Sequence, residues 1–71
     1  MKKPAYPVLA QLMAKHGLNK GDISNVIGLS YRNTLKKLNG ERVFNLVEAG
    51  KVVKSFIDLG ESVTIDDIFF A

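Results

Sequence analysis

The side chains best suited to specific recognition of another molecule are concentrated in one short stretch near the middle of the chain. Between positions 32 and 37 the chain carries Arg32, Asn33, Lys36 and Lys37. Arginine and lysine donate hydrogen bonds to the O6 and N7 atoms of guanine, and asparagine pairs with the N6 and N7 atoms of adenine. These residue types therefore match the hydrogen-bonding groups that duplex DNA displays in its major groove.

Groups for catalysis or metal binding are scarce by comparison. The chain has no cysteine, and His16 is its one histidine. Asp66 and Asp67 are adjacent, and adjacent residues on a helix point about 100° apart, so an acidic first helical turn explains them better than a catalytic pair does. Glycine-rich phosphate loops and nucleophile motifs are absent from the sequence. We expect no enzyme activity, no metal and no cofactor.

Charge is distributed unevenly along the chain, which has a net charge of +3. The middle holds the basic residues Lys20, Arg32, Lys36, Lys37 and Arg42, and the C-terminal part holds the acidic residues Glu61, Asp66 and Asp67. Clustered positive charge favours an anionic partner, and a solvated surface with scattered lysines is the alternative.

The length of 71 residues suits one small domain, which we place at residues 1–71. The hydrophobic fraction of 46% is sufficient for a packed core. No apolar run reaches the roughly 18 residues that a membrane-spanning helix needs, and the start MKKPAYP lacks the apolar segment of a signal peptide. We therefore expect a cytoplasmic protein that does not enter a membrane.

The spacing of apolar residues predicts five short helices, and strand signals are weak throughout. The expected helices cover residues 7–16, 19–27, 30–38, 46–58 and 65–70. Pro7 suits the first position of a helix, and Ser30 and Asn45 are typical N-caps. Gly28 is placed to end the second helix. The sequence thus predicts an all-α domain.

The second and third expected helices are joined by the short turn Gly28-Leu29-Ser30. Two short amphipathic helices joined in this way form a helix-turn-helix, which places its second helix in the major groove of DNA. On the third helix Thr34, Leu35 and Leu38 share one side, which we assign to the core with Tyr31 at its edge. The opposite side presents the four polar residues of positions 32–37.

Phosphate contacts are expected beside this reading face, because they hold a protein in register on the duplex. Lys20 lies at the start of the second helix, where the helix dipole also attracts an anion. Lys37, Asn39, Gly40 and Arg42 lie at the end of the third helix and just after it. The alternative is that the lysines only make a short helix soluble and that Asn39-Gly40 only ends it.

Four segments, LNKGDISNVIGLS, LNGER, FNLVEAGKVV and TIDDIFF, resemble in their order and spacing the lambda-repressor-like, or Xre/Cro-type, helix-turn-helix proteins of phages and their hosts. The resemblance covers the chain from about Leu18 to Phe69. It implies a five-helix bundle in which Lys20 contacts a phosphate. It also implies that Tyr31, Arg32 and Asn33 read bases, with Lys36 one turn later.

One position of the third helix departs from the family pattern. Family members usually carry an apolar residue where this chain has Thr34, and here the apolar residue follows one place later, at Leu35. The difference predicts that, compared with family members, the third helix is rotated about its axis or begins at a different residue. It leaves Tyr31 facing either the DNA or the core. We favour Arg32, Asn33 and Lys36 as base contacts.

These features predict a sequence-specific duplex-DNA-binding transcriptional regulator, such as a Cro-like protein or a short phage repressor. A weak homodimer would read the two half-sites of a near-palindromic operator. Phe56, Ile68 and Phe70 in the C-terminal half are the expected dimer contacts. The alternative is a protein-interaction module, an antirepressor or corepressor, that binds a partner repressor instead of DNA.

Overall fold

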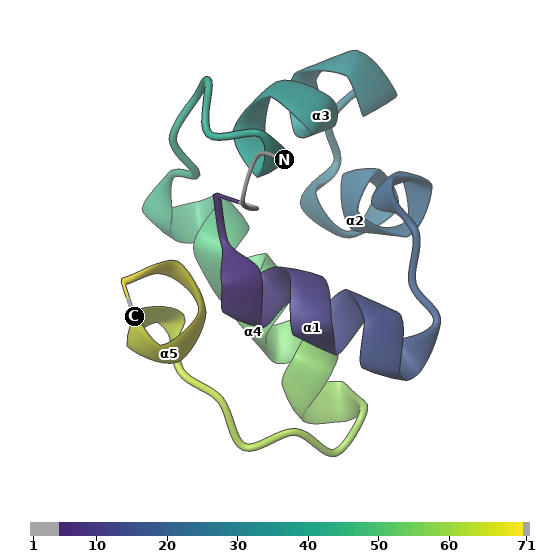
Figure 1. The fold of residues 1–71 in the computed structure, drawn as a ribbon, viewed down its shortest axis with the longest axis vertical. Coiled ribbons are helices and arrows are strands. Elements are labelled where there is room, and N and C mark those ends of the chain that lie inside the picture. The colour runs from purple at the N-terminus through teal and green to yellow at the C-terminus, as the bar shows by residue number, and fades with distance from the viewer. Residues whose placement is uncertain (1–4, 71) are drawn as a thin grey trace.

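Residues 5–70 fold into helices connected by short loops. The computed structural model describes these residues, and the two ends of the predicted domain, residues 1–4 and 71, lie outside it. The described part forms no strand and five helices (Figure 1): α1 (Pro7–His16), α2 (Lys20–Ile27), α3 (Tyr31–Leu38), α4 (Leu46–Asp58) and α5 (Ile65–Phe69). The predicted all-α class and helix positions are confirmed, with helix ends within one residue of those expected.

Four of the five helices, α2 to α5, begin at a side chain that accepts a hydrogen bond from the first turn, whereas α1 begins at Pro7 without such a cap. In α2, α4 and α5 the cap side chain accepts the N–H of the third helical residue, and the carboxylate of that residue accepts the N–H of the cap. The pairs are Asn19 with Asp22, Asn45 with Glu48, and Thr64 with Asp67. Because these bonds join residues three apart, the sequence alone is enough to locate these three helix starts.

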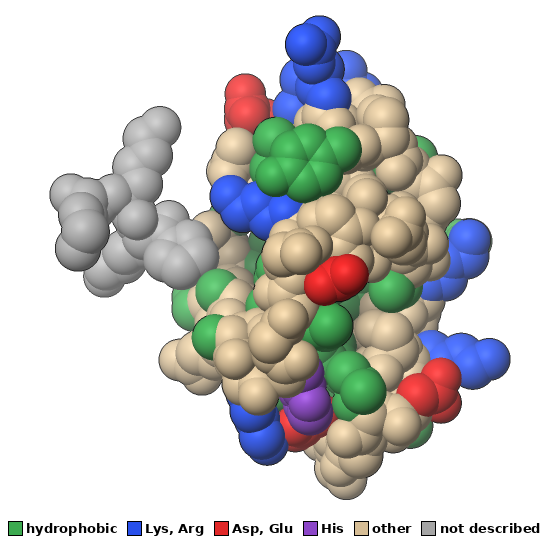
Figure 2. Space-filling view, turned by 90° about the vertical axis from the view of Figure 1, so that its right-hand side faces the viewer, with side chains coloured by type: hydrophobic (Ala, Val, Ile, Leu, Met, Phe, Trp, Pro, Cys, Tyr) green, Lys and Arg blue, Asp and Glu red, His purple; other side chains and the backbone are tan. Residues whose placement is uncertain are grey.

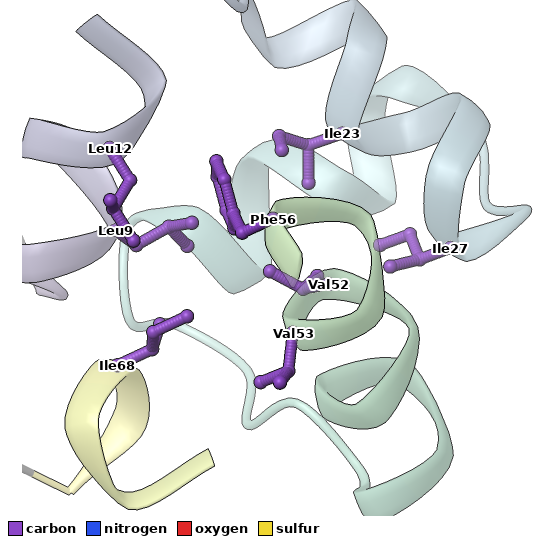
Figure 3. Packing of buried hydrophobic residues seen from close by; sticks show 8 residues of the cluster. All are labelled: Leu9, Leu12, Ile23, Ile27, Val52, Val53, Phe56 and Ile68. Atoms are coloured by element: carbon purple, nitrogen blue, oxygen red, sulfur yellow. The ribbon is translucent and has the colours of Figure 1, made fainter. Parts of the chain in front are cut away.

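The hydrophobic core lies between α1, α2, α4 and α5. Phe56 of α4 is fully buried at its centre, between Leu9 and Leu12 of α1 and Ile23 of α2 (Figure 3). The rest of the cluster is Ile27, Val52, Val53 and Ile68. None of these residues comes from α3, which lies at one end of the molecule, away from α5 (Figure 1). The other four helices therefore form a body that carries α3.

Two of the three predicted dimer contacts belong to this core. Phe56 is 0% exposed and Ile68 is 2% exposed, so neither side chain can reach a second copy of the folded chain. Their assignment as dimer contacts is wrong, because the bundle itself covers the apolar faces on which periodicity places them. Phe70, the third predicted contact, follows α5 and is 76% exposed.

A small aromatic cluster closes the bundle beside the core. Tyr6, which precedes α1, packs edge-on against Phe44 and Phe69, with ring centroids 5.4 and 5.3 Å away. The ring centroids of Phe44 and Phe69 lie 5.0 Å apart. Since Phe44 immediately precedes the cap of α4, the cluster anchors the segment that leads from α3 into the body.

The other end of α1 is tied to the segment between α4 and α5 by Glu61. Its Oε2 atom lies 2.7 Å from Lys15 Nζ and 2.7 Å from His16 Nε2. The hydrogen bonds from Lys15 and His16 outweigh desolvation and lower the pKa of Glu61 below its ordinary value. His16 is therefore part of a contact that holds the bundle together.

Candidate nucleic-acid interface

A tight turn joins α2 to α3. Gly28 adopts a left-handed conformation with φ of 74°, and its N–H donates to the Ser24 carbonyl at 2.9 Å. The N–H of Leu29 donates to the same carbonyl at 3.2 Å, and the Leu29 side chain packs against the core. Glycine adopts this backbone conformation at no steric cost, so the chain can turn here and begin α3 at Tyr31.

Thr34 determines which side of α3 faces the body. Its side chain is fully buried, and its hydroxyl is satisfied because it donates to the Ser30 carbonyl at 2.9 Å. Ser30 Oγ accepts the N–H of Asn33 at 3.3 Å and caps the helix. Leu35 is only half-buried and lies outside the core cluster. The rotation of this helix predicted from Leu35 is therefore wrong, since Thr34 itself takes the inward position.

The first turn of α3 presents its other side to solvent. Arg32 and Asn33 are exposed, and Tyr31 is 54% exposed. Tyr31 thus lies outside the core, so of the two orientations left open for it the core-facing one is wrong. Lys36, one turn later, is half-buried. In Figure 2, which faces the side of the molecule where α2 lies, Lys and Arg side chains lie at the end occupied by α3, and others lie along the right edge and at the opposite end.

Lys37 points back into the molecule. Its side chain is 12% exposed, its Nζ pairs with the Glu48 carboxylate, and it also donates to the Val43 carbonyl at 3.2 Å. The centroid of the Phe44 ring lies 5.9 Å from the ammonium group. A lysine held in this way is not free to contact a phosphate. The prediction for Lys37 is therefore corrected, because this side chain joins α3 to the start of α4.

Glu48 receives this ion pair and caps α4 at the same time. Its Oε1 atom accepts the N–H of Asn45 at 3.1 Å, and Asn45 Oδ1 accepts the N–H of Glu48 at 2.8 Å. Burial acts to raise the pKa of Glu48, but the hydrogen bonds from Lys37 and Asn45 and the charges of Lys37 and Lys51 outweigh it and lower the pKa. The sequence indicated the cap, but no spacing rule indicates that Lys37 and Glu48 meet.

The remaining predicted phosphate contacts lie at the surface. These residues are Lys20 at the start of α2 and Asn39, Gly40 and Arg42 after α3, all of them exposed. The Asp22 carboxylate accepts the N–H of Asn19 at 2.9 Å, so an acid of the chain itself partly neutralises the positive end of α2. An anion at this place would be attracted by the Lys20 side chain more than by the helix end.

An open groove that the sequence did not predict lies beside these residues. It runs along α1, where Leu9 and Met13 contribute to its apolar lining, and hydrophobic side chains are visible within the hollow in Figure 2. Lys20, Tyr31 and Asn39 line the same groove. Residues from the start of α2 and from both ends of α3 therefore meet around one hollow, although no periodic pattern in the sequence signals it.

Within residues 5–70, no group of three or more His, Asp or Glu side chains is placed to hold a metal ion. Among the helices of that part, none combines the length and the apolar character needed to cross a bilayer.

Comparison of the chain with models of protein families, with characterised proteins and with solved structures finds no match. Function is therefore inferred from the residues of this chain.

Proposed function

We propose that this chain is a sequence-specific DNA-binding regulator in which α2 and α3 form a helix-turn-helix and α3 enters the major groove. The observation that carries the proposal is the opposite placement of neighbouring side chains on α3. Thr34 is fully buried against the body, whereas Arg32 and Asn33 are exposed, and α3 as a whole lies at one end of the molecule (Figure 1). A protruding, capped helix of this kind has the form needed to enter a groove about 12 Å wide.

The exposed residues supply the chemistry for base recognition. Arg32 is able to donate two hydrogen bonds to guanine, and Asn33 is able to pair with adenine. Each good paired contact discriminates against a wrong base by about 1–3 kcal/mol. Tyr31 adds an exposed ring and hydroxyl next to them. Contacts of this strength at two positions give a useful sequence preference, and binding alone, without chemical catalysis, is sufficient for the function.

Charged residues beside α3 supply affinity that does not depend on sequence. Lys20 and Arg42 are exposed at the start of α2 and after α3. Each lysine or arginine that neutralises a phosphate releases a counterion, so binding weakens as salt rises. Lys36, one turn after Arg32, is half-buried. In the proposed complex its ammonium group contacts a base or a phosphate next to the base that Arg32 contacts.

The resemblance to lambda-repressor-like proteins supports the same function. The order of the helices and the capped third helix are compatible with that fold. We therefore propose a Cro-like protein or short repressor of phage type, which blocks a promoter by occupying its operator in proportion to protein concentration.

Selection from a library of random duplexes, carried out at two salt concentrations, tests this proposal. The chain should recover a defined motif, and Arg32→Ala should recover a motif with one position relaxed. Lys54→Ala is the matched control, because Lys54 is an exposed lysine of α4 outside the proposed interface. Strongly salt-sensitive binding without any motif contradicts sequence-specific recognition. Failure to bind any duplex contradicts DNA binding and favours a protein-interaction module.

A further inference from the structure

The chain between α3 and α4 contains a short segment, residues 41–43, whose side chains all face solvent. Glu41 and Arg42 are exposed, and Val43 is 82% exposed. Packing of these side chains therefore contributes little to where the 41–43 segment lies. The position of its backbone matters for the proposed function, because it decides whether the guanidinium of Arg42 can reach a phosphate.

Backbone hydrogen bonds hold the beginning of the 41–43 segment on α3. The N–H groups of Glu41 and Arg42 both donate to the Lys36 carbonyl, at 2.9 and 3.3 Å. Gly40, just before them, has a left-handed conformation with φ of 83°, and its N–H donates to the Lys37 carbonyl at 3.1 Å. These bonds turn the chain at the end of α3 and hold it as far as Arg42.

The other end of the 41–43 segment is held by the side chain of Lys37, which is 12% exposed. Its ammonium group donates to the Val43 carbonyl at 3.2 Å and pairs with the Glu48 carboxylate. The same carboxylate accepts the N–H of Asn45, the cap of α4, at 3.1 Å. One cation thus bonds both to the segment and to the start of α4, and it closes the loop that carries Arg42.

We propose that Lys37 is a positioning residue for DNA binding, which holds Arg42 where its guanidinium meets a phosphate and does not itself contact the duplex. This role rests on the proposed function and extends it to a residue that acts through another. A loop that is already ordered in the free protein loses less conformational entropy on binding, so it binds more tightly than a mobile one. Loss of the Lys37 contacts should therefore lower the affinity for DNA.

The effect should fall on affinity and not on sequence preference, because α3 has other anchors. Thr34 is fully buried, and Leu38 packs against the core. The turn that presents Arg32 and Asn33 is therefore held in place without Lys37. The 41–43 segment has no buried side chain of its own, so it is the part that should move.

The double variant Lys37→Met with Glu48→Gln tests this role at constant net charge, since it removes one positive and one negative group. Methionine has no N–H to donate to Val43, whereas glutamine still offers an oxygen to the Asn45 N–H. Fluorescence anisotropy with a random-sequence duplex at several salt concentrations measures the dissociation constant and the salt slope. The double variant should raise the dissociation constant at least about threefold and reduce the salt slope towards the value of Arg42→Ala, which should lie about 1 below the wild type.

Combining the double variant with Arg42→Ala identifies the residue through which Lys37 acts. In the Arg42→Ala background the double variant should weaken binding no further, because the contact that it disturbs is already lost. Two controls separate this effect from charge and from stability. Lys54→Met removes an exposed cation of α4, and Val53→Ala weakens the core without touching the 41–43 segment. Both should change the salt slope much less than Arg42→Ala does.

Amide hydrogen exchange of the DNA-free chain provides a measurement that does not depend on binding. In the double variant the N–H groups of Glu41 and Arg42 should exchange faster by more than the overall loss of stability explains, because the 41–43 segment opens locally. The N–H of Thr34 should follow the overall stability. In Val53→Ala all three amides should follow the overall stability alike.

Several results would overturn this role of Lys37. They are an unchanged salt slope in the double variant, equal losses of affinity with and without Arg42→Ala, an equal change of slope in Val53→Ala, and exchange of Arg42 that only follows the overall stability. A wild type that binds no duplex would contradict the proposed function, and this role with it. Wild-type binding that the double variant retains in full would contradict this role alone.

Discussion

At the scale of single residues, burial separates side chains that can meet DNA from those that hold the fold. Arg32 and Asn33 are adjacent to the fully buried Thr34, so one helical turn both anchors α3 and presents its polar groups. Lys37, five positions after Arg32 on the same helix, points inward because it pairs with Glu48. Among the polar residues of positions 32–37, Arg32, Asn33 and the half-buried Lys36 therefore remain available for recognition.

Substitutions at Arg32 and Lys20 should weaken DNA binding in different ways. Arg32→Ala should cost about 1–3 kcal/mol on the preferred duplex and little on others, because it removes a base contact. Lys20→Ala should weaken binding to all duplexes alike and reduce the salt slope by about 1. Fluorescence anisotropy on preferred and scrambled duplexes at several salt concentrations distinguishes the two. Equal effects of both substitutions on specificity would contradict these roles.

The ion pair between Lys37 and Glu48 should contribute to folding. Lys37→Met should destabilise the chain by about 3 kcal/mol, because it leaves the buried Glu48 carboxylate without its cation. Lys37→Met combined with Glu48→Gln should recover part of this loss, since the amide oxygen still accepts the N–H of Asn45. Urea unfolding of both single variants and the double variant measures the coupling. Strictly additive effects would show that the two side chains do not stabilise each other.

The lowered pKa of Glu48 predicts a loss of stability in acid. A carboxyl whose pKa is lower in the folded chain than in the unfolded chain contributes stability above its ordinary pKa, 4.5 for glutamate, and loses it as pH falls through the folded value. Urea midpoints should therefore fall as pH drops below about 5, and less steeply in Glu48→Gln. Glu41→Gln, an exposed control, should follow the wild type. Identical slopes in all three proteins would exclude this role of Glu48.

At the scale of helices, local rules explain what the sequence predicted and tertiary contacts explain what it did not. Caps such as Asn45 act over three residues, so helix starts can be read from the sequence. The direction of Lys37 depends on Glu48, a residue of another helix. Helical periodicity placed both Thr34 and Leu35 on the inner side of α3. In the folded chain Thr34 is fully buried against the other helices, whereas Leu35 is only half-buried. The groove beside α1 is likewise a product of packing.

The N-cap of α3 offers a test at this scale. Ser30→Ala removes the side-chain acceptor of the Asn33 N–H and should destabilise the chain by about 1 kcal/mol, whereas Ser30→Gly should cost only a few tenths. Amide hydrogen exchange should quicken in the first turn of α3, while α1 and α4 change only by the overall loss of stability. Unchanged protection of Asn33 and Thr34 would show that the cap does not hold the start of this helix.

At the scale of the whole molecule, the proposed DNA contacts fall at one end of a small body. Four helices pack around Phe56 and leave α3 at one end (Figures 1 and 3). A small hollow bordered by Val43, Leu46 and Phe70 lies where the segment after α3 enters the body and meets α5. No residue of α3 lines this hollow, so the two surfaces are separate.

A nuclear magnetic resonance titration of the ¹⁵N-labelled chain with a random-sequence duplex at low salt tests the central claim most directly. Nonspecific binding uses the same phosphate contacts, so no knowledge of the operator is needed. Amide shifts should change for Tyr31, Arg32 and Asn33, and for Lys20 and Arg42 beside them. Changes confined to α4 and α5, with α3 unaffected, would contradict the placement of α3 in the major groove.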